Sequence, residues 1–161
     1  GYMGSGKTTV GKRLANKLKL TFIDLDNLIE TEVGKTIPEI FNTQGEQGFR
    51  ELEKEFLLKV SGQENTIIST GGGTPCFFDN MDLMNTAGTT IYLKMSVKGL
   101  CSRLQNAKTE RPLIKNKSAE ELQNFIEKSL AERSVFYEKA KYIINGENVN
   151  PDEIISLIQL K

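Results

Sequence analysis

A glycine-rich stretch, GYMGSGKTT, occupies residues 1–9. It matches the pattern GxxxxGK(S/T), in which backbone N–H groups and a lysine surround the phosphates of a nucleoside triphosphate. In that pattern Lys7 reaches the β- and γ-phosphates, and the Thr8 hydroxyl binds Mg²⁺. The stretch predicts a nucleotide site whose candidate residues are Gly4, Ser5, Gly6, Lys7, Thr8 and Thr9. The pattern does not indicate which acceptor receives the phosphate.

Two carboxylates follow a short apolar run in the segment FIDLD. Asp24 and Asp26 lie two residues apart, so we expect both to project from one face of a strand. Ligands of parallel α/β sheets gather at the carboxyl ends of strands, and a kinase needs one carboxylate near Mg²⁺ and another near the acceptor hydroxyl. The alternative is that these residues cap a helix that begins at Asn27.

Arginine is the less common cation, because lysine supplies sixteen of the 21 basic residues. A guanidinium group binds carboxylates and phosphates with two parallel hydrogen bonds, which an ammonium group cannot do. Arg111 lies in a polar segment, residues 106–117, that we expect to be a mobile loop able to close over phosphates. Arg50 has an alternative role in helical ion pairs, and Arg133 has one on a solvated helix face. The five arginines are Arg13, Arg50, Arg103, Arg111 and Arg133.

Three consecutive glycines, residues 71–73, follow the second apolar run in the segment TGGG. Glycine has no side chain, so a ligand can approach such a backbone closely. A tight turn is the alternative, although a turn needs only one glycine.

Composition excludes several classes of site. The chain has 161 residues, of which 38% are hydrophobic and 26% charged, with a formal net charge of zero. These values favour one globular domain over residues 1–161 and give no indication of a nucleic-acid or membrane partner. The absence of histidine excludes a His general base and His-ligated zinc. Cys76 and Cys101 are predicted to be thiols in a cytoplasmic protein, with a disulfide as the alternative.

Short apolar runs alternate with helical patterns along the whole chain. This alternation predicts a central parallel sheet with helices on both faces. A strand should precede the phosphate loop, so we expect an upstream apolar segment ahead of Gly1. Capping boxes are predicted at Thr36 with Glu39 and at Ser118 with Glu121. The expected strands are residues 21–26, 65–69, 89–93 and 142–144, and the expected helices are 8–20, 27–60 with breaks at Gly34 and Gly45, 96–105, 118–140 and one from Asn150.

Six segments together resemble the shikimate kinase family in order and spacing. They are GYMGSGKTTVGKRLA, FIDLD, GEQGFRELE, STGGGT, ERPLI and AERSVFYEKA. The resemblance implies a P-loop kinase with a lid at about residues 106–117 and a substrate-binding helical segment at about residues 27–60. It also implies transfer of a phosphoryl group from ATP, with Mg²⁺, to the 3-hydroxyl of shikimate by a monomeric enzyme.

The resemblance further implies a role for each site residue. Arg50 and Arg133 are similar to the arginines that hold the shikimate carboxylate, and Gly72 is similar to the glycine whose N–H meets the substrate. Asp26 resembles the aspartate that accepts the hydroxyl proton, and Asp24 resembles the one that helps Thr8 to hold Mg²⁺. Arg111 resembles the lid arginine that covers ATP, so Lys7, Asp26 and Arg111 are the expected catalytic residues.

Two other functions are open to a chain with this phosphate loop. A gluconate-type or nucleoside monophosphate kinase would keep the fold and change the acceptor, but arginine and glycine suit a small polar acid better than a nucleobase. A nucleotide-hydrolysing switch would need a guanine-reading NKxD segment, and the segment NKSA at Asn116 lacks the aspartate.

Overall fold

Helices and short strands alternate along the chain in the computed structural model, which describes residues 1–107, 114 and 117–159. In chain order the elements are α1 (Lys7–Leu18), β1 (Thr21–Asp24), α2 (Leu25–Val33), α3 (Ile37–Ser61), β2 (Thr66–Ser69), the 3-10 turn η1 (Thr74–Cys76), α4 (Asn80–Ala87), β3 (Ile91–Lys94), α5 (Val97–Gln105), α6 (Ala119–Tyr137), β4 (Tyr142–Asn145) and α7 (Pro151–Gln159). The parallel α/β class predicted from the sequence is confirmed.

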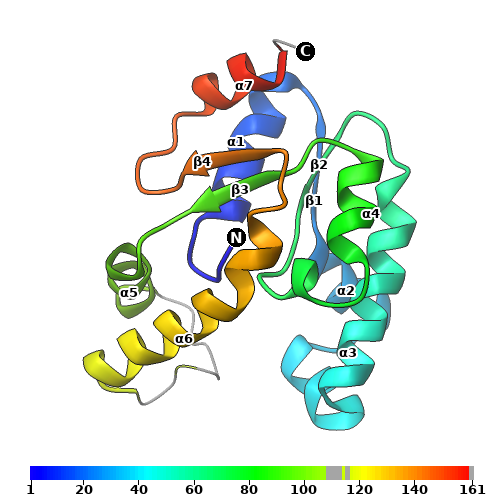
Figure 1. Cartoon of the computed structure of the whole chain (residues 1–161). Helices are drawn as coiled ribbons and strands as arrows, with labels where there is room; N and C mark the ends of the chain where they lie inside the picture. The colour runs from blue at the N-terminus through cyan, green and yellow to red at the C-terminus, as the bar shows by residue number, and fades with distance from the viewer. Residues whose placement is uncertain (108–113, 115–116, 160–161) are drawn as a thin grey trace.

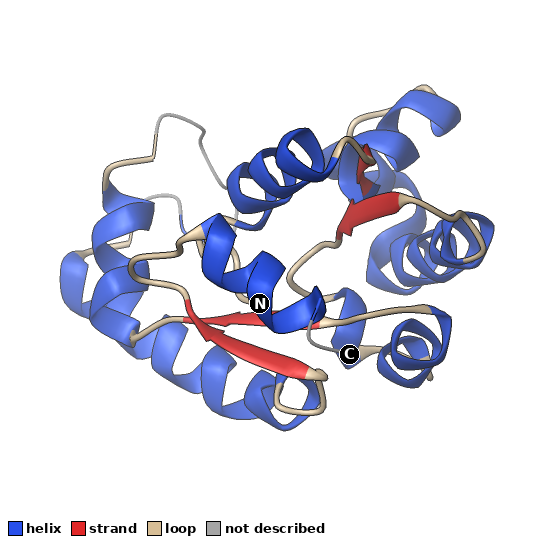
Figure 2. Ribbon diagram, turned by 90° about the horizontal axis from the view of Figure 1, so that it is seen from above, coloured by secondary structure: helices blue, strands red, loops and turns tan. Residues whose placement is uncertain are grey.

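The four described strands form two parallel pairs. β1 pairs with β2 and places Phe22 opposite Ile67. β3 pairs with β4 and places Tyr92 opposite Ile143. Figure 1 shows the first pair beside α2, α3 and α4 and the second pair beside α5 and α6. Seen from above in Figure 2, helices lie around both pairs.

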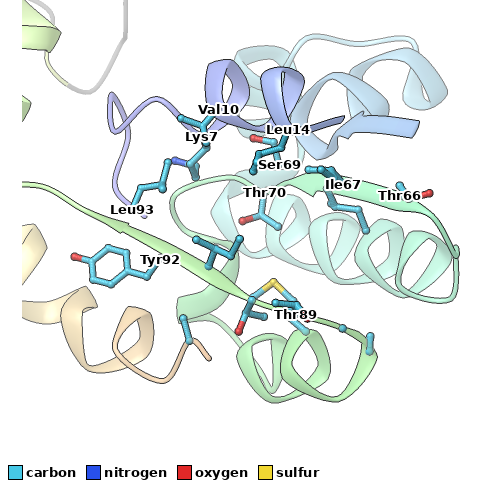
Figure 3. A pocket seen from close by; sticks show the side chains of 18 of the residues that line it. Lys7, Val10, Leu14, Thr66, Ile67, Ser69, Thr70, Thr89, Tyr92 and Leu93 are labelled. Atoms are coloured by element: carbon cyan, nitrogen blue, oxygen red, sulfur yellow. The ribbon is translucent and has the colours of Figure 1, made fainter. Parts of the chain in front are cut away.

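A cavity of about 520 Å³, here called the inter-sheet cavity, separates the two strand pairs. Val10 and Leu14 of α1 line it, together with Ile67 of β2 and Tyr92 and Leu93 of β3 (Figure 3). Its lining is mainly apolar, which does not suit a charged phosphate ligand. The inter-sheet cavity is therefore not the nucleotide site that the sequence predicts.

The structure does not test the strand expected ahead of the phosphate loop, because the loop itself begins at Gly1. Gly1 lines the inter-sheet cavity, so a strand that led into Gly1 would run between β2 and β3. There it would join the two pairs into the single sheet that the sequence predicts. This strand stays a prediction.

Two apolar clusters hold the helices in place. One joins α2 to α3 through Ile29, Ile40 and Leu57, which are almost completely buried. The other centres on Leu100 of α5 and Ile126 of α6. The second cluster supports the phosphate loop, because it includes Tyr2, and the first packs against β1 through Ile23.

Local sequence features set several helix boundaries as predicted. Both capping boxes are present, Thr36 with Glu39 on α3 and Ser118 with Glu121 on α6. Gly45 breaks the regular geometry of α3 with a φ of 72°, a conformation that favours glycine. Helix α4 is not predicted from the sequence, because its polar residues favour a helix only weakly.

One expectation about the strands is wrong. Asp24 ends β1, but Asp26 already lies in the first turn of α2, so the two carboxylates do not share a strand face. The helix begins at Leu25 because the Asp24 side chain accepts a hydrogen bond from Asn27 N at 3.4 Å. The capping alternative is therefore confirmed for Asp24.

No described helix has both the length and the apolar character needed to cross a bilayer.

The contact of α1 with β1 gives a test of how the phosphate loop is supported. Gly11 is buried, and a methyl group there would lie 2.7 Å from Phe22 Cε2. We expect Gly11→Val to lower the free energy of unfolding by about 1–3 kcal/mol, because the added side chain overpacks this contact. Urea denaturation measures the change. Arg13→Val places the same residue at an exposed position of α1 and should cost much less; equal losses would contradict the packing argument.

Candidate active site

The phosphate loop has the backbone geometry that its glycines predict. Gly4 and Gly6 have φ values of 80° and 93°, which side chains other than glycine rarely adopt. Gly6 precedes α1, and no side chain caps that end of the helix. The first N–H groups of α1 are thus not capped by a side chain, and they lie at the positive end of the helix dipole, where an anion is stabilised.

Lys7 lies against its own loop. Its ammonium group donates hydrogen bonds to Gly1 O at 2.8 Å and Tyr2 O at 2.9 Å. A nearby cation of this kind can exchange such carbonyl contacts for phosphate oxygens, which are stronger acceptors. Ser5 differs from the other predicted nucleotide residues, because it is buried and its N–H donates to Tyr2 O at 3.2 Å.

A pocket of about 260 Å³, here called the polar pocket, lies beside this loop. Its lining brings together residues from the phosphate loop, the β1–α2 junction and the segment after β2. These are Met3, Gly4, Gly6, Lys7, Thr8, Thr9, Asp24, Asp26, Ser69, Thr70, Gly71 and Gly72. Most of the nucleotide residues predicted from the sequence therefore share a pocket with both aspartates and Gly72. Arg50 and Arg133 do not line it.

Thr8 and Asp24 meet directly in this pocket. The Thr8 hydroxyl donates to Asp24 Oδ2 at 2.8 Å, so the α1 terminus and the end of β1 are joined. A hydroxyl and a carboxylate oxygen are ligands that Mg²⁺ accepts, but it commonly takes only one or two from the protein and the rest from phosphates and water. Consistent with that, the described residues contain no group of three or more His, Cys, Asp or Glu side chains that could hold a metal. The pair fits Mg²⁺ that arrives with a nucleotide.

The pKa of Asp26 is raised by its surroundings in the pocket. Burial raises its pKa to about 6, with smaller contributions from the negative charges of Glu53 and Asp24 and an opposing one from Lys7. Its Oδ1 atom is buried and, among the described residues, has no hydrogen-bond partner. A carboxylate with these properties is suited to accept a proton near neutral pH.

Arg50 of α3 is buried, with 8% of its surface exposed. It pairs with Glu53 at 2.8 Å and with the more exposed Glu46 at 3.2 Å. The ring of Phe77 lies 4.2 Å from the guanidinium carbon, and the planar group thus packs on an aromatic face. The ion-pair alternative is confirmed, yet within the described chain the buried Nε atom has no hydrogen-bond partner and can still donate to a ligand.

The three glycines of residues 71–73, here called the glycine tripeptide, lie among these groups. A methyl group at Gly71 would lie 2.7 Å from Glu53 Oε1 and 2.9 Å from Asp26 Oδ1. One at Gly73 would lie 2.6 Å from Arg50 Nη1. Side chains would thus push the acids and the arginine away, which is why this turn needs more than one glycine.

Arg133 of α6 is half-buried, and its guanidinium carbon lies 5.6 Å from the centre of the Tyr2 ring. It therefore does not lie on a fully solvated face, which was the alternative. Arg133 and Arg50 each lie near enough to Cys76 to oppose the rise that burial causes in the pKa of its thiol. Both arginines thus lie near η1, the turn that follows the glycine tripeptide.

Arg111 and most of the predicted lid, residues 106–117, lie outside the described residues. The structure places the remaining predicted site residues at the phosphate loop, the start of α2, α3, the glycine tripeptide and α6.

Two residues of the site were missed as such in the sequence. Glu53 is 1% exposed and accepts a short hydrogen bond from the Thr74 hydroxyl at 2.5 Å. The sequence pattern indicates a buried, paired acid at Glu53. This residue lies between Phe49 and Leu57 on the apolar face of a helix, where an unpaired acid would be costly. Tyr137 donates from its hydroxyl to Gly72 O at 2.5 Å. It follows Arg133 by four residues and so lies on the same helix face.

Known proteins of one family are similar to this chain in sequence and in fold. Residues 3–160 match the sequence model of the family described as shikimate kinase. A shikimate kinase of Parabacteroides distasonis is 52% identical over 149 residues, which are 92% of this chain and 86% of that protein.

Two solved structures have the same fold. That of shikimate kinase from Bacteroides thetaiotaomicron is 44% identical, with a TM-score of 0.96 over 99% of this chain and 95% of its own. Shikimate kinase from Acinetobacter baumannii, described in complex with shikimate, is 33% identical, with a TM-score of 0.85 over 99% and 90% of the two chains. Because the family model covers residues 3–160 and these relatives are similar over almost their whole length, this chain belongs to the shikimate kinase family.

Proposed function

We propose that the chain transfers the γ-phosphoryl group of ATP to the 3-hydroxyl of shikimate and so forms shikimate 3-phosphate and ADP. The observation that carries the proposal is the polar pocket, in which the phosphate loop and Asp26 face the same space. A donor held by the loop and an acceptor held beside Asp26 would meet there. Most of the catalysis of phosphoryl transfer comes from such positioning and from charge neutralisation.

The acceptor carboxylate is assigned to Arg50 and Arg133. Both lie near the turn that begins at Thr74, and Arg50 is fixed by Glu53 and Phe77 before any ligand arrives. A guanidinium that is already oriented loses little entropy on binding, so it favours one pose of a small acid. The N–H of Gly72 is the further contact assigned to the substrate.

The phosphates are assigned to the loop. Backbone N–H groups at the start of α1 and the Lys7 ammonium would surround the β- and γ-phosphates. Thr8 and Asp24 would hold Mg²⁺, which neutralises phosphate charge when bound. Arg111 is assigned to the lid that covers the nucleotide, and closure of such a lid would keep out water, the competing acceptor.

Asp26 is assigned as the proton acceptor. As the 3-hydroxyl oxygen bonds to the γ-phosphorus, its proton passes to the Asp26 carboxylate and the β,γ-bridging oxygen leaves with ADP. Because the pKa of Asp26 is raised to about 6, the carboxylate is a stronger base than an ordinary aspartate and still ionised at pH 7. The cytoplasmic location and the monomeric state stay predictions.

A coupled assay of ADP release tests the function itself. We expect Mg²⁺-dependent ADP formation with shikimate and little with gluconate, nucleoside monophosphates or no acceptor. Equal ADP release without an acceptor would support a hydrolase, and a preference for another acceptor would overturn the substrate assignment.

Arg50→Lys tests how the acceptor carboxylate is held. Lysine keeps the charge but cannot form the two-pronged contact, so we expect shikimate binding to weaken by about 2–5 kcal/mol. Nucleotide affinity should change little, because Arg50 does not line the polar pocket. Calorimetric titration with each ligand measures both effects. Arg13→Lys, at an exposed position, is the matched control; unchanged shikimate affinity in Arg50→Lys would remove Arg50 from the substrate site.

The pKa of Asp26 gives a prediction about pH. Below about pH 6 this carboxyl group is mostly protonated and cannot accept a proton, so kcat/KM should fall as pH decreases through that value. The profile is measured at limiting concentrations of both substrates. A flat profile down to roughly pH 5 would contradict the assignment.

Asp26→Asn separates the catalytic role from the structural one. We expect loss of turnover together with a fold that is more stable at neutral pH, because a charge that burial disfavours is removed. The sign follows from the raised pKa: the folded state binds more protons than the unfolded state between the ordinary value of 3.8 and about 6, so ionisation of Asp26 destabilises the fold as pH rises. Thermal unfolding against pH should show this slope for the parent protein, and substitution should reduce it.

A further inference from the structure

All three carbonyls of the glycine tripeptide accept hydrogen bonds. Gly71 O accepts from Thr74 N at 3.3 Å, and Gly73 O accepts from Cys76 N at 2.8 Å. These two bonds belong to the turn itself. Gly72 O instead accepts from the Tyr137 hydroxyl at 2.5 Å, a donor that is 65 residues away in sequence. The middle glycine is therefore held by a different element, the last turn of α6.

Tyr137 is itself fixed. Its side chain is 1% exposed, and its ring packs on Tyr92 with centroids 5.1 Å apart. Burial raises the pKa of the phenol, so the hydroxyl remains protonated and able to donate. A rigid donor of this kind can fix the orientation of the peptide group that it contacts.

The α-carbon of Gly72 lies close to the phosphate loop. A methyl group on this glycine would lie 3.1 Å from Met3 N and 3.4 Å from Gly1 O. Gly72 thus has both the loop backbone and the Tyr137 hydroxyl as neighbours. Without that hydroxyl, one of its two restraints is lost and a glycine has wide conformational freedom.

Tyr137 also lies beside Arg133, the residue one helical turn earlier. The guanidinium is close enough for its charge to oppose the effect of burial on the pKa of the Tyr137 hydroxyl. The hydroxyl that donates to Gly72 O therefore also lies near Arg133, and the proposed function assigns both groups to the acceptor.

We propose that Tyr137 is a positioning residue for the acceptor substrate, because its hydroxyl ties the Gly72 peptide to the turn of α6 that carries Arg133. The inference rests on the proposed function of the same site. It assigns to Tyr137 no contact with the reacting atoms, so its loss should affect acceptor binding more than nucleotide binding.

Tyr137→Phe tests the inference, because it removes one hydroxyl and keeps the ring packing. Since a hydrogen bond of this kind is worth about 1 kcal/mol, we expect KM and Kd for shikimate to rise about three- to tenfold. KM for ATP should stay within about twofold, and kcat should fall less than kcat/KM for shikimate. Tyr92→Phe is the matched control: it removes a hydroxyl from the adjacent ring, which forms no hydrogen bond to Gly72 or Arg133 within the described part of the chain.

The outcomes are distinguishable. If the parent protein does not phosphorylate shikimate, the proposed function fails. If it does, and Tyr137→Phe has the same shikimate KM as Tyr92→Phe, the positioning role is overturned. Equal losses for shikimate and ATP, with a lower thermal midpoint, would indicate a purely structural hydroxyl and would also overturn it.

Discussion

The site depends on a close approach between a bare glycine backbone and buried charged groups. Asp26 and Glu53 lie so near Gly71, and Arg50 so near Gly73, that any side chain on these glycines would displace them. Three elements, α2, α3 and the segment after β2, can then meet at one point. The phosphate loop approaches the same segment, because a methyl group on Gly72 would lie 3.1 Å from Met3 N. The glycine tripeptide therefore adjoins both the loop proposed to hold the nucleotide and the groups proposed to hold the acceptor.

Two acids beside the glycine tripeptide, Glu53 and Asp26, have different charge environments. Glu53 is paired with Arg50 and bonded to the Thr74 hydroxyl, so its charge is compensated. Asp26 is compensated less, since burial and the two neighbouring acids outweigh the effect of Lys7 on its pKa. The fold thus keeps one carboxylate as a fixed counter-ion for the arginine. The other carboxylate, that of Asp26, has a raised pKa and can accept a proton near neutral pH. Its buried charge lowers the stability of the fold, as is common for functional groups.

The sequence predicts those parts of the fold and site that depend on local chemistry. The phosphate loop, both capping boxes and the break at Gly45 follow from residue types at short spacing, and the structure has all of them. Asp26 was placed wrongly because a cap at Asp24 starts α2 earlier than the period of the apolar run suggests. The roles of Glu53 and Tyr137 depend on tertiary contacts with Thr74 and Gly72, which are 21 and 65 residues away. No local pattern specifies such partners.

Asp24 shows why donor and acceptor residues cannot be separated in this fold. Its carboxylate caps α2, the helix that carries Asp26, and accepts a hydrogen bond from Thr8 in the first turn of α1. A shift of either helix would therefore displace both the proposed metal ligands and the proposed base. If Thr8 and Asp24 hold Mg²⁺ as proposed, they would supply only part of its shell, and phosphate oxygens and water would have to supply the rest. Binding of the ion would then be coupled to alignment of the nucleotide, through the residue that also caps α2.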